Sequence, residues 1–206
     1  MSETRRALVE AATEAFAEQG VFTASLVEIT RRAGQRNRGA VHYHFGSREG
    51  LLVAVLEQHA GFLAEREEVL LARARSSPGL APVLEAIVRP AVELAETGPS
   101  GRQYLVIIGE LVEEYDRLDD AVDEALRHTG GYAVFELLEQ RLPDLDDALR
   151  NERLALVTGF ILRSVADRAR AQQSGSPGRS QLPTERFVRN LLAMAAAMAD
   201  APAVDV

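Results

Sequence analysis

Helical periodicity over almost the whole chain is the feature that most limits its fold. Apolar residues recur three and four positions apart between glycine and proline residues, and no segment alternates apolar and polar residues as a half-buried strand does. We therefore expect an all-α fold of about nine helices, the first three of them short. The pattern predicts helices near residues 4–19, 25–33, 37–45, 48–75, 82–96, 103–115, 118–141, 145–172 and 184–199.

Composition excludes several classes of protein. The chain has 206 residues, 47% of them hydrophobic, which is enough to bury a sizeable core. It has no cysteine, so disulfides, thiolate nucleophiles and cysteine metal sites are excluded together. No apolar run approaches the roughly 20 residues that span a bilayer, and the N-terminus lacks the apolar stretch of a secretory signal. We expect a cytoplasmic protein without a membrane partner.

The charge is distributed unevenly along the chain. The net charge of −8 argues against a general nucleic-acid binder. However, residues 1–50 carry seven arginines and six acidic residues, whereas residues 51–206 carry sixteen arginines and twenty-five acidic residues. Five arginines and no acidic residue lie between Arg31 and Arg48. One short basic segment on an acidic body indicates that only this segment meets a polyanion, although a solvated basic face would have the same composition.

Residues 25–49 contain two short predicted helices joined by a turn with a glycine, which is typical of a helix-turn-helix. Ser25 and Glu28 form a capping-box pattern at the start of the first helix. In the second helix, Arg36 and Arg38 are long enough to reach guanine or phosphate. Asn37 can cap this helix or read an adenine, and capping is the role that we expect.

The segment from Leu8 to Leu52 resembles the DNA-binding domain of the TetR family of repressors. The matching residues begin with an alanine-rich helix that ends in a phenylalanine and a glycine, and they close with a glycine, a small and an aliphatic residue, His-Phe, and then Ser-Arg-Glu. In this chain they are Ala11, Ala12, Phe16, Gly20, Ser25, Leu26, Glu28, Ile29, Ala33, Gly34, Gly39, Ala40, Val41, His44, Phe45, Ser47, Arg48 and Glu49.

The resemblance implies specific contacts with operator DNA. Ser25 would contact phosphate, Gly39 would let the backbone approach the DNA closely, and Ser47 and Arg48 would meet phosphate at the start of the helix over 48–75. The chain departs from the family in two places: the turn 35–38 is one residue longer, and His42 replaces the usual tyrosine, with Tyr43 one position later. Either His42 or Tyr43 would therefore take the phosphate contact of that tyrosine.

The resemblance also divides the chain into a helix-turn-helix domain over 1–46 and a ligand-sensing and dimerisation domain over 47–206. It implies a homodimer formed by the last two helices and a cavity for a small-molecule effector, which the aliphatic composition suggests is hydrophobic. The expected dimer residues are Leu154, Val157, Ile161, Val165, Phe187, Leu191, Met194 and Met198. The candidate ligand residues, for each of which ordinary core packing is the more common explanation, are Phe62, Tyr104, Ile108, Leu111, Tyr115 and Phe135.

We predict no cofactor, metal or catalytic site. His42 and His44 lie two positions apart on a helix, so their side chains point roughly 200° apart and do not meet at one ion. The chain lacks the motifs of helical zinc proteases, serine hydrolases and phosphate-binding loops. The alternatives to a ligand-released repressor are an activator or a non-sensing DNA-binding protein of the same fold, a helical enzyme using Glu110 or Asp167, and a helical scaffold.

Overall fold

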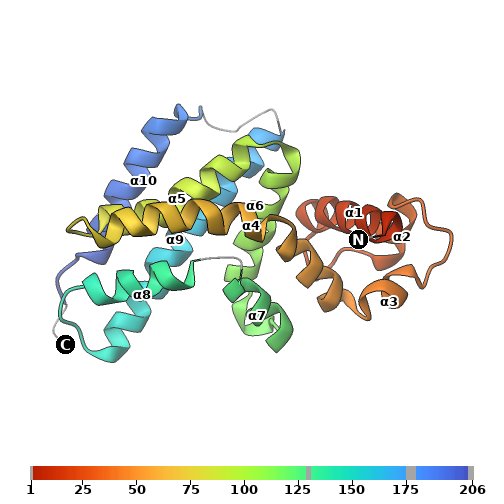
Figure 1. Ribbon diagram of the computed structural model, residues 1–206, viewed down its shortest axis with the longest axis horizontal. Coiled ribbons are helices and arrows are strands. Elements are labelled where there is room, and N and C mark those ends of the chain that lie inside the picture. The colour runs from red at the N-terminus through yellow and green to blue at the C-terminus, as the bar shows by residue number, and fades with distance from the viewer. Residues whose placement is uncertain (1, 129–130, 175–179, 204–206) are drawn as a thin grey trace.

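The computed structural model describes residues 2–128, 131–174 and 180–203, and every regular element in these ranges is helical. The predicted all-α class is confirmed. Within the same ranges, no helix combines the length and the apolar character needed to cross a membrane. Figure 1 shows the elements in order: α1 (Glu3–Gln19), α2 (Leu26–Arg32), α3 (Ala40–Phe45), α4 (Arg48–Arg75), α5 (Ala81–Glu96), α6 (Pro99–Glu113), the 3₁₀ helix η1 (Tyr115–Arg117), α7 (Asp120–His128), α8 (Tyr132–Arg141), α9 (Asp147–Ser174) and α10 (Thr184–Ala199).

Two predicted boundaries differ from the structure. The single helix expected over 118–141 is two helices, because α7 ends at His128 and α8 begins at Tyr132. The helix expected from 103 begins at Pro99, where proline is favourable because the first turn of a helix needs no hydrogen bond from its nitrogen.

The first three helices surround a small core of their own. Leu8 and Phe16 of α1, Ile29 of α2 and Val41 of α3 are all buried. The hydroxyl of Ser25 accepts a hydrogen bond from the backbone N–H of Glu28 at 3.4 Å, as the capping pattern predicts. The second half of the predicted capping box is absent, because the Glu28 carboxylate binds arginines of its own helix instead.

Helix α4 joins this three-helix unit to the rest of the protein. Its first turn is capped by the Ser47 hydroxyl, which accepts from the N–H of Gly50 at 3.1 Å. Figure 1 shows α4 starting beside α3 and continuing through the C-terminal helices, where it packs against α5 and α7. A movement of α4 relative to these helices would therefore be transmitted to both parts of the chain.

The closest helix pair is α6 with α9. A Cβ atom placed on Gly109 of α6 would lie 2.7 Å from the Cβ of Ala166 on α9, which is too short for two carbon atoms. Gly109 therefore allows the two helices to touch. Gly159 of α9 has no such neighbour, because nothing lies within 4 Å of the position that its Cβ would take.

Two buried arginines of α9 hold the ends of α10. Arg168 donates to the carbonyl of Leu182 at 2.9 Å, just before α10 begins, and its guanidinium lies 4.6 Å from the centre of the Phe187 ring. At the other end, Arg153 donates to the carbonyls of Ala199 at 3.3 Å and Pro202 at 3.2 Å. The last helix is thus fastened to α9 at both ends.

Candidate nucleic-acid interface

Two arginines at the end of α2 are paired with acidic side chains. Arg31 donates to Glu28 at 2.7 Å, and Arg32 donates to Glu18 at 2.7 Å and to Glu28 at 3.1 Å. Hydrogen bonds from Arg31 and then Arg32 lower the pKa of Glu28 to about 2, so this carboxylate stays ionised well into the acid range. The basic segment that the sequence identified is therefore partly neutralised at its N-terminal end.

The free positive charge lies on the turn that follows. Arg36 and Arg38 are exposed, and neither side chain has a hydrogen-bond or ion-pair partner among the described residues. They lie between α2 and α3, at the right-hand end of the molecule in Figure 1. Of the five arginines between positions 31 and 48, these two are the ones with open guanidinium groups.

Asn37 shapes this turn. Its Oδ1 accepts a hydrogen bond from the N–H of Gly39 at 2.9 Å, and α3 begins at Ala40 with Gly39 as its N-cap residue. The expected role of Asn37 as a helix cap is therefore corrected, because the side chain closes a local turn two residues before the helix. The same oxygen would have to leave Gly39 to read an adenine with both ends of the amide.

His42 and Tyr43 differ in how much of each side chain is available. The Nδ1–H of His42 donates to the carbonyl of Gly46 at 2.9 Å, which ties the ring to the end of α3. Tyr43 is 82% exposed, and its ring contacts His44 edge-on at 4.9 Å between the ring centres. The Tyr43 side chain is therefore largely open to solvent, whereas one nitrogen of His42 is already in use.

Arg48 is a part of the scaffold in this structure. Its guanidinium donates to the carbonyls of Val21 at 2.8 Å and Ala24 at 2.7 Å. Both carbonyls belong to the loop 20–24 between α1 and α2. The expected contact of Arg48 with phosphate would require these two hydrogen bonds to be shared or broken.

The other groups at the start of α4 also have partners. The Ser47 hydroxyl caps the helix, and its hydrogen bond with the Glu49 carboxylate lowers the pKa of Glu49. A phosphate at this helix terminus would therefore lie close to an ionised carboxylate.

Glu110 links the two parts of the chain. Its Oε1 on α6 accepts a hydrogen bond from the N–H of Val21 at 2.9 Å. Burial raises the pKa of Glu110, and the hydrogen bond from Val21 offsets part of that rise. The preceding Gly20 has a φ of +91°, which favours glycine, and a Cβ there would lie 3.0 Å from the same carboxylate oxygen.

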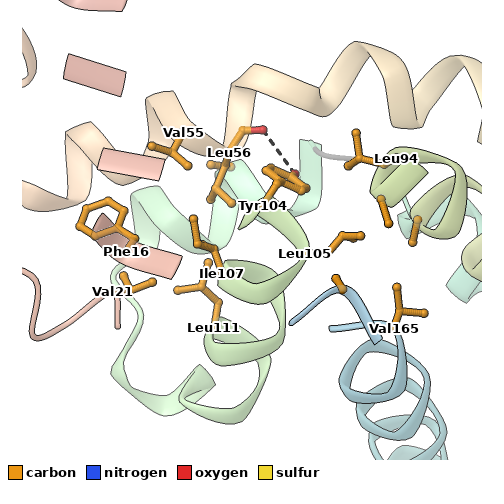
Figure 2. Close-up of a cluster of buried hydrophobic side chains, with 14 of the residues drawn as sticks. Phe16, Val21, Val55, Leu56, Leu94, Tyr104, Leu105, Ile107, Leu111 and Val165 are labelled. Atoms are coloured by element: carbon orange, nitrogen blue, oxygen red, sulfur yellow. Dashed lines mark hydrogen bonds between the residues drawn. The ribbon is translucent and has the colours of Figure 1, made fainter. Parts of the chain in front are cut away.

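Apolar side chains continue the link on either side of Glu110. Figure 2 shows Phe16 and Val21 of the N-terminal unit facing Ile107 and Leu111 of α6, and all four side chains are buried. Nearby, the Arg117 guanidinium lies 4.1 Å from the centre of the Phe22 ring. The loop 20–24, which leads directly into α2, is therefore held by α4, α6 and η1.

Sequence reasoning considered Glu110 only as a buried acid of an alternative enzyme. Its actual partner lies 89 positions away in the chain, so no local pattern could indicate the pairing. The charge pattern did identify Arg36 and Arg38, but it could not separate them from the three arginines that have partners.

The candidate ligand residues do not converge on one hollow in this structure. Tyr104 and Leu111 are fully buried, and the Tyr104 hydroxyl donates to the carbonyl of Leu56 at 3.4 Å (dashed in Figure 2). Tyr115 is half-exposed and donates to Asp123 at 2.6 Å. Phe62, Ile108 and Phe135 are partly buried against the core. None of the six lines the junction hollow described below, so their role in ligand binding stays a prediction.

The predicted dimer residues fall into two groups. Val157, Ile161, Val165 and Leu191 are at most 3% exposed within one chain, so each is largely covered before a second copy arrives. The first three lie on α9, which packs against α6, α10 and α5, and Leu191 lies on α10, which packs against α5 and α9. A role of these four side chains in a dimer stays a prediction. Met194 is 47% exposed, and Leu154, Phe187 and Met198 are partly buried.

Among the described residues, no group of three or more histidine or acidic side chains is arranged to hold a metal ion. Neither His42 nor His44 takes part in such a cluster.

Two models of known protein families match this chain. Residues 8–55 match the family model described as "Bacterial regulatory proteins, tetR family", and residues 85–198 match "Tetracyclin repressor-like, C-terminal domain". The chain belongs to the TetR family of transcriptional regulators. The two matches cover the unit that carries the free arginines and most of the C-terminal helices of this TetR-family protein.

Curated relatives of this TetR-family chain are transcriptional regulators by name. The HTH-type transcriptional regulator SrpR of Pseudomonas putida is 30% identical over 138 residues, and the HTH-type transcriptional repressor BepR of Brucella suis biovar 1 is 32% identical over 133 residues. The matched region covers 61% of this chain in both cases, and 61% and 62% of the two relatives. The chain thus matches about three fifths of the length of each.

Solved structures share the fold at low sequence identity. A TetR-family structure from Shewanella sp. PV-4 is 20% identical, with a TM-score of 0.57, and covers 94% of this chain and 96% of its own. NalD of Pseudomonas aeruginosa is 24% identical, with a TM-score of 0.54, and covers 93% of both chains. This TetR-family protein therefore shares the fold of these structures over the compared length.

Proposed function

We propose that this TetR-family chain binds double-stranded operator DNA as a homodimer, represses transcription in the cytoplasm, and leaves the operator when a small hydrophobic effector binds its C-terminal helices. The observation that carries the proposal is the pair Arg36 and Arg38. They are exposed and unpartnered on the helix-turn-helix turn, with no acidic residue between positions 31 and 48.

The functional division that we propose is residues 1–46 for DNA binding and 47–206 for sensing and dimerisation. In a helix-turn-helix, the N-terminal end of the second helix enters the major groove. In this chain that end is Gly39 and Ala40, directly after Arg36 and Arg38. Arginine in this position donates to guanine O6 and N7 or to phosphate, and the missing side chain of Gly39 leaves room for the DNA backbone.

We assign the phosphate contact of α3 to Tyr43. The Nδ1–H of His42 donates to the Gly46 carbonyl, which holds the ring against the end of α3 and leaves Nε2 as the one ring nitrogen without that bond. The Tyr43 hydroxyl can donate, and the side chain is 82% exposed. Ser25 would add a second phosphate contact from the start of α2.

For Arg48 we propose an indirect role. Its two hydrogen bonds fix the carbonyls of Val21 and Ala24, and Ala24 immediately precedes Ser25. Arg48 would thus position the start of α2 against the DNA rather than bind the phosphate itself. Ser47 would remain the helix cap that sets the direction of α4.

A dimer provides two recognition helices for two half-sites, roughly 34–36 Å apart on one face of the DNA. We propose that the outward faces of α9 and α10 form its interface. Leu156 is 57% exposed, Met194 is 47% exposed, and Gly159 has open space beside it, which would allow close approach of a helix from a second copy. Ala155, Ala193 and Ala197 are small exposed residues on the same two helices.

Repression and release by an effector are supported by relatives. BepR is named a transcriptional repressor, and it shares 32% identity with this chain over 133 residues. The fold is also found in AibR, which was solved in complex with isovaleryl coenzyme A and operator DNA, with a TM-score of 0.59 and 18% identity. Release would follow if the effector binds more tightly to a conformation whose recognition helices are wrongly spaced for the operator. We propose no enzymatic activity.

The test is selection of bound duplex fragments from the source genome, followed by anisotropy titrations at several salt concentrations. We expect a specific fragment whose affinity falls steeply with salt, because bound arginines release counterions from phosphate. Arg36→Ala/Arg38→Ala should weaken binding by about tenfold or more and reduce the slope of log affinity against log salt by up to about two.

The matched control is Arg73→Ala/Arg75→Ala, which removes the same charge from two exposed arginines at the far end of α4. It should bind the fragment like the parent protein. If Arg36→Ala/Arg38→Ala also binds normally, or if no duplex binds in a salt-sensitive way, the proposed function is wrong.

A further inference from the structure

A hollow of about 230 Å³ lies at the junction between the helix-turn-helix unit and the C-terminal helices. Its walls come from the loop 20–24, the first turns of α4, and the segment that joins η1 to α7. Five of the lining residues are apolar: Val21, Phe22, Leu52, Leu118 and Val122. None of them belongs to the candidate ligand residues or to the proposed DNA contacts.

Two arginines at the rim of this junction hollow already have partners. Arg48 donates to the carbonyls of Val21 and Ala24. Arg117 donates to Glu114 at 3.1 Å and lies over the Phe22 ring. Each guanidinium is therefore engaged within the protein, which weakens its attraction for an anion in the hollow.

Two acidic residues at the rim are also occupied. Oδ1 of Asp119 accepts from the N–H of Val122 at 2.8 Å, which caps the start of α7. Glu49 is hydrogen-bonded to the Ser47 side chain. The rim therefore has equal numbers of positive and negative groups, and each is engaged within the protein.

We propose that the junction hollow is a binding site for a neutral, mainly apolar molecule about the size of a substituted benzene. The walls combine five apolar residues with four charged ones that already have partners, so they favour a neutral molecule with an apolar body over a charged one, which would lose hydration on entering. The volume is below the roughly 300 Å³ at which pockets for drug-sized ligands begin, which limits the ligand to fragment size.

The site has a direct connection to DNA binding, and this part of the inference rests on the proposed function. Val21 and Phe22 line the hollow and belong to the loop that leads into Ser25. An occupant that moves this loop would change the bonds of Val21 to Glu110 and Arg48, and with them the position of α2. Binding of the small molecule and of the operator would then be linked energetically, in both directions.

The experiment compares three ligands of one shape: benzyl alcohol, benzoate and benzylamine. Each is titrated into the ¹⁵N-labelled full-length protein, and the amide shifts are followed by NMR. We expect saturable shifts at Val21, Phe22 and Val122 with benzyl alcohol, with a dissociation constant on the order of 1 mM. Benzoate and benzylamine should bind at least about tenfold more weakly. Absent or scattered shifts, or equal binding of a charged analogue, would overturn the proposal.

The second measurement uses a variant in which a larger side chain fills the hollow. Leu118→Trp places an indole at a lining position, whereas Ala121→Trp places it at an exposed position one residue before the lining residue Val122. The parent chain has no tryptophan, so the fluorescence of each variant reports on the new side chain alone. We expect blue-shifted emission and lost benzyl alcohol binding for Leu118→Trp, and unchanged binding for Ala121→Trp. Benzyl alcohol binding that survives in Leu118→Trp would contradict the proposed site. If this variant does not fold, the NMR titration of the wild-type protein still tests the site.

The coupling between binding of the small molecule and binding of the operator is measured by comparing the operator affinity with and without saturating benzyl alcohol. A change of about fivefold or more supports coupling, and no change despite binding shows that the hollow is not coupled to the DNA. If the protein binds no duplex at all, the proposed function fails while the NMR titration still decides whether the site exists.

Discussion

The carboxylate of Glu110 accepts a hydrogen bond from the backbone N–H of Val21 across the junction between α6 and the loop 20–24, at 2.9 Å. Val21 is fully buried, so its N–H has no access to water in the folded protein. The bond therefore satisfies a buried donor of the DNA-binding unit with a side chain of the sensor helices. Its loss would affect the orientation of one part relative to the other.

Replacing Glu110 separates the hydrogen bond from the charge. Glu110→Ala leaves the Val21 N–H without a partner and should lower the free energy of unfolding by about 1–3 kcal/mol. Glu110→Gln keeps an accepting oxygen and should lower it less. Chemical denaturation at pH 7 measures both, and Glu114→Gln, directly after the same helix, is the control. Equal losses for the alanine and glutamine variants would show that the oxygen does not act as the acceptor.

The raised pKa of Glu110 also predicts a pH dependence. The folded chain holds the proton of this carboxyl to higher pH than the unfolded chain does. The contribution of Glu110 to stability therefore falls as pH rises from the unfolded pKa of about 4.5 through the folded one. The unfolding free energy of the parent minus that of Glu110→Gln should decrease over this range. A difference that increases with pH would contradict the assignment.

Arg48 offers a test of scaffold against phosphate contact. Arg48→Ala removes the donors for the carbonyls of Val21 and Ala24 and should destabilise the fold by about 1–3 kcal/mol. Arg48→Lys should rescue little, because one ammonium group does not reproduce the two-pronged geometry. Operator affinity should fall in both variants while the salt slope stays that of the parent. A slope reduced by about one, with unchanged stability, would instead indicate a phosphate contact.

The exposed hydroxyl of Tyr43 gives a prediction about DNA alone. Tyr43→Phe should weaken binding several-fold for specific and non-specific duplexes alike, because a phosphate contact carries no sequence information. The melting temperature should not change, since the side chain is 82% exposed. Tyr132→Phe removes a hydroxyl from another exposed tyrosine and should bind DNA normally. Loss of binding in His42→Gln but not in Tyr43→Phe would reverse the assignment.

The dimer surface can be tested without DNA. Leu156→Arg and Met194→Arg each place a charge on the outward face of α9 or α10, and both should shift the protein towards monomer in sedimentation velocity. Val69→Arg, on an apolar residue of α4 that is 61% exposed, is the matched control and should leave the oligomeric state unchanged. Variants at 156 and 194 that sediment like the parent would place the interface elsewhere.

The contact between α6 and α9 predicts opposite effects for two glycines. Gly109→Ala should destabilise the protein by about 1–3 kcal/mol, because the new methyl group overlaps Ala166. Within a single chain, Gly159→Ala should be neutral or stabilising by up to about 1 kcal/mol, since its Cβ meets nothing there, so both variants are compared in the Leu156→Arg background that is expected to be monomeric. Thermal and chemical denaturation measure both. The double variant Gly109→Ala/Ala166→Gly should recover most of the loss, and a failure to recover would contradict the steric explanation.

Local patterns predicted the DNA-binding unit well because its determinants are local. The cap at Ser25, the break after α3 and the positions of Arg36 and Arg38 depend on neighbours within a few residues. Asn37 was predicted to cap the helix, but its side chain accepts a hydrogen bond from Gly39 within the turn. The pattern does not separate these roles because a cap and a local turn use the same side-chain oxygen. Glu110, by contrast, acts through a residue 89 positions away.

The predicted dimer stripe on α9 shows a different limit. Val157, Ile161 and Val165 form the most regular apolar series on this helix, and hydrophobic periodicity indicates burial without naming the partner that buries it. In the fold, α9 packs against α6, α10 and α5, and all three side chains are buried within one chain. The outward face is marked instead by residues such as Leu156 and Gly159, which sequence alone cannot distinguish from ordinary exposed positions.

The two arginines that fasten α10 to α9 bear on how two copies would meet. With Arg168 at one end and Arg153 at the other, the final helix has little freedom to fray or swing before association. A second chain would encounter a surface that is already ordered, so dimerisation would lose less conformational entropy than the docking of a loose helix. Weakening either anchor should therefore slow assembly, even though both arginines are buried within one chain.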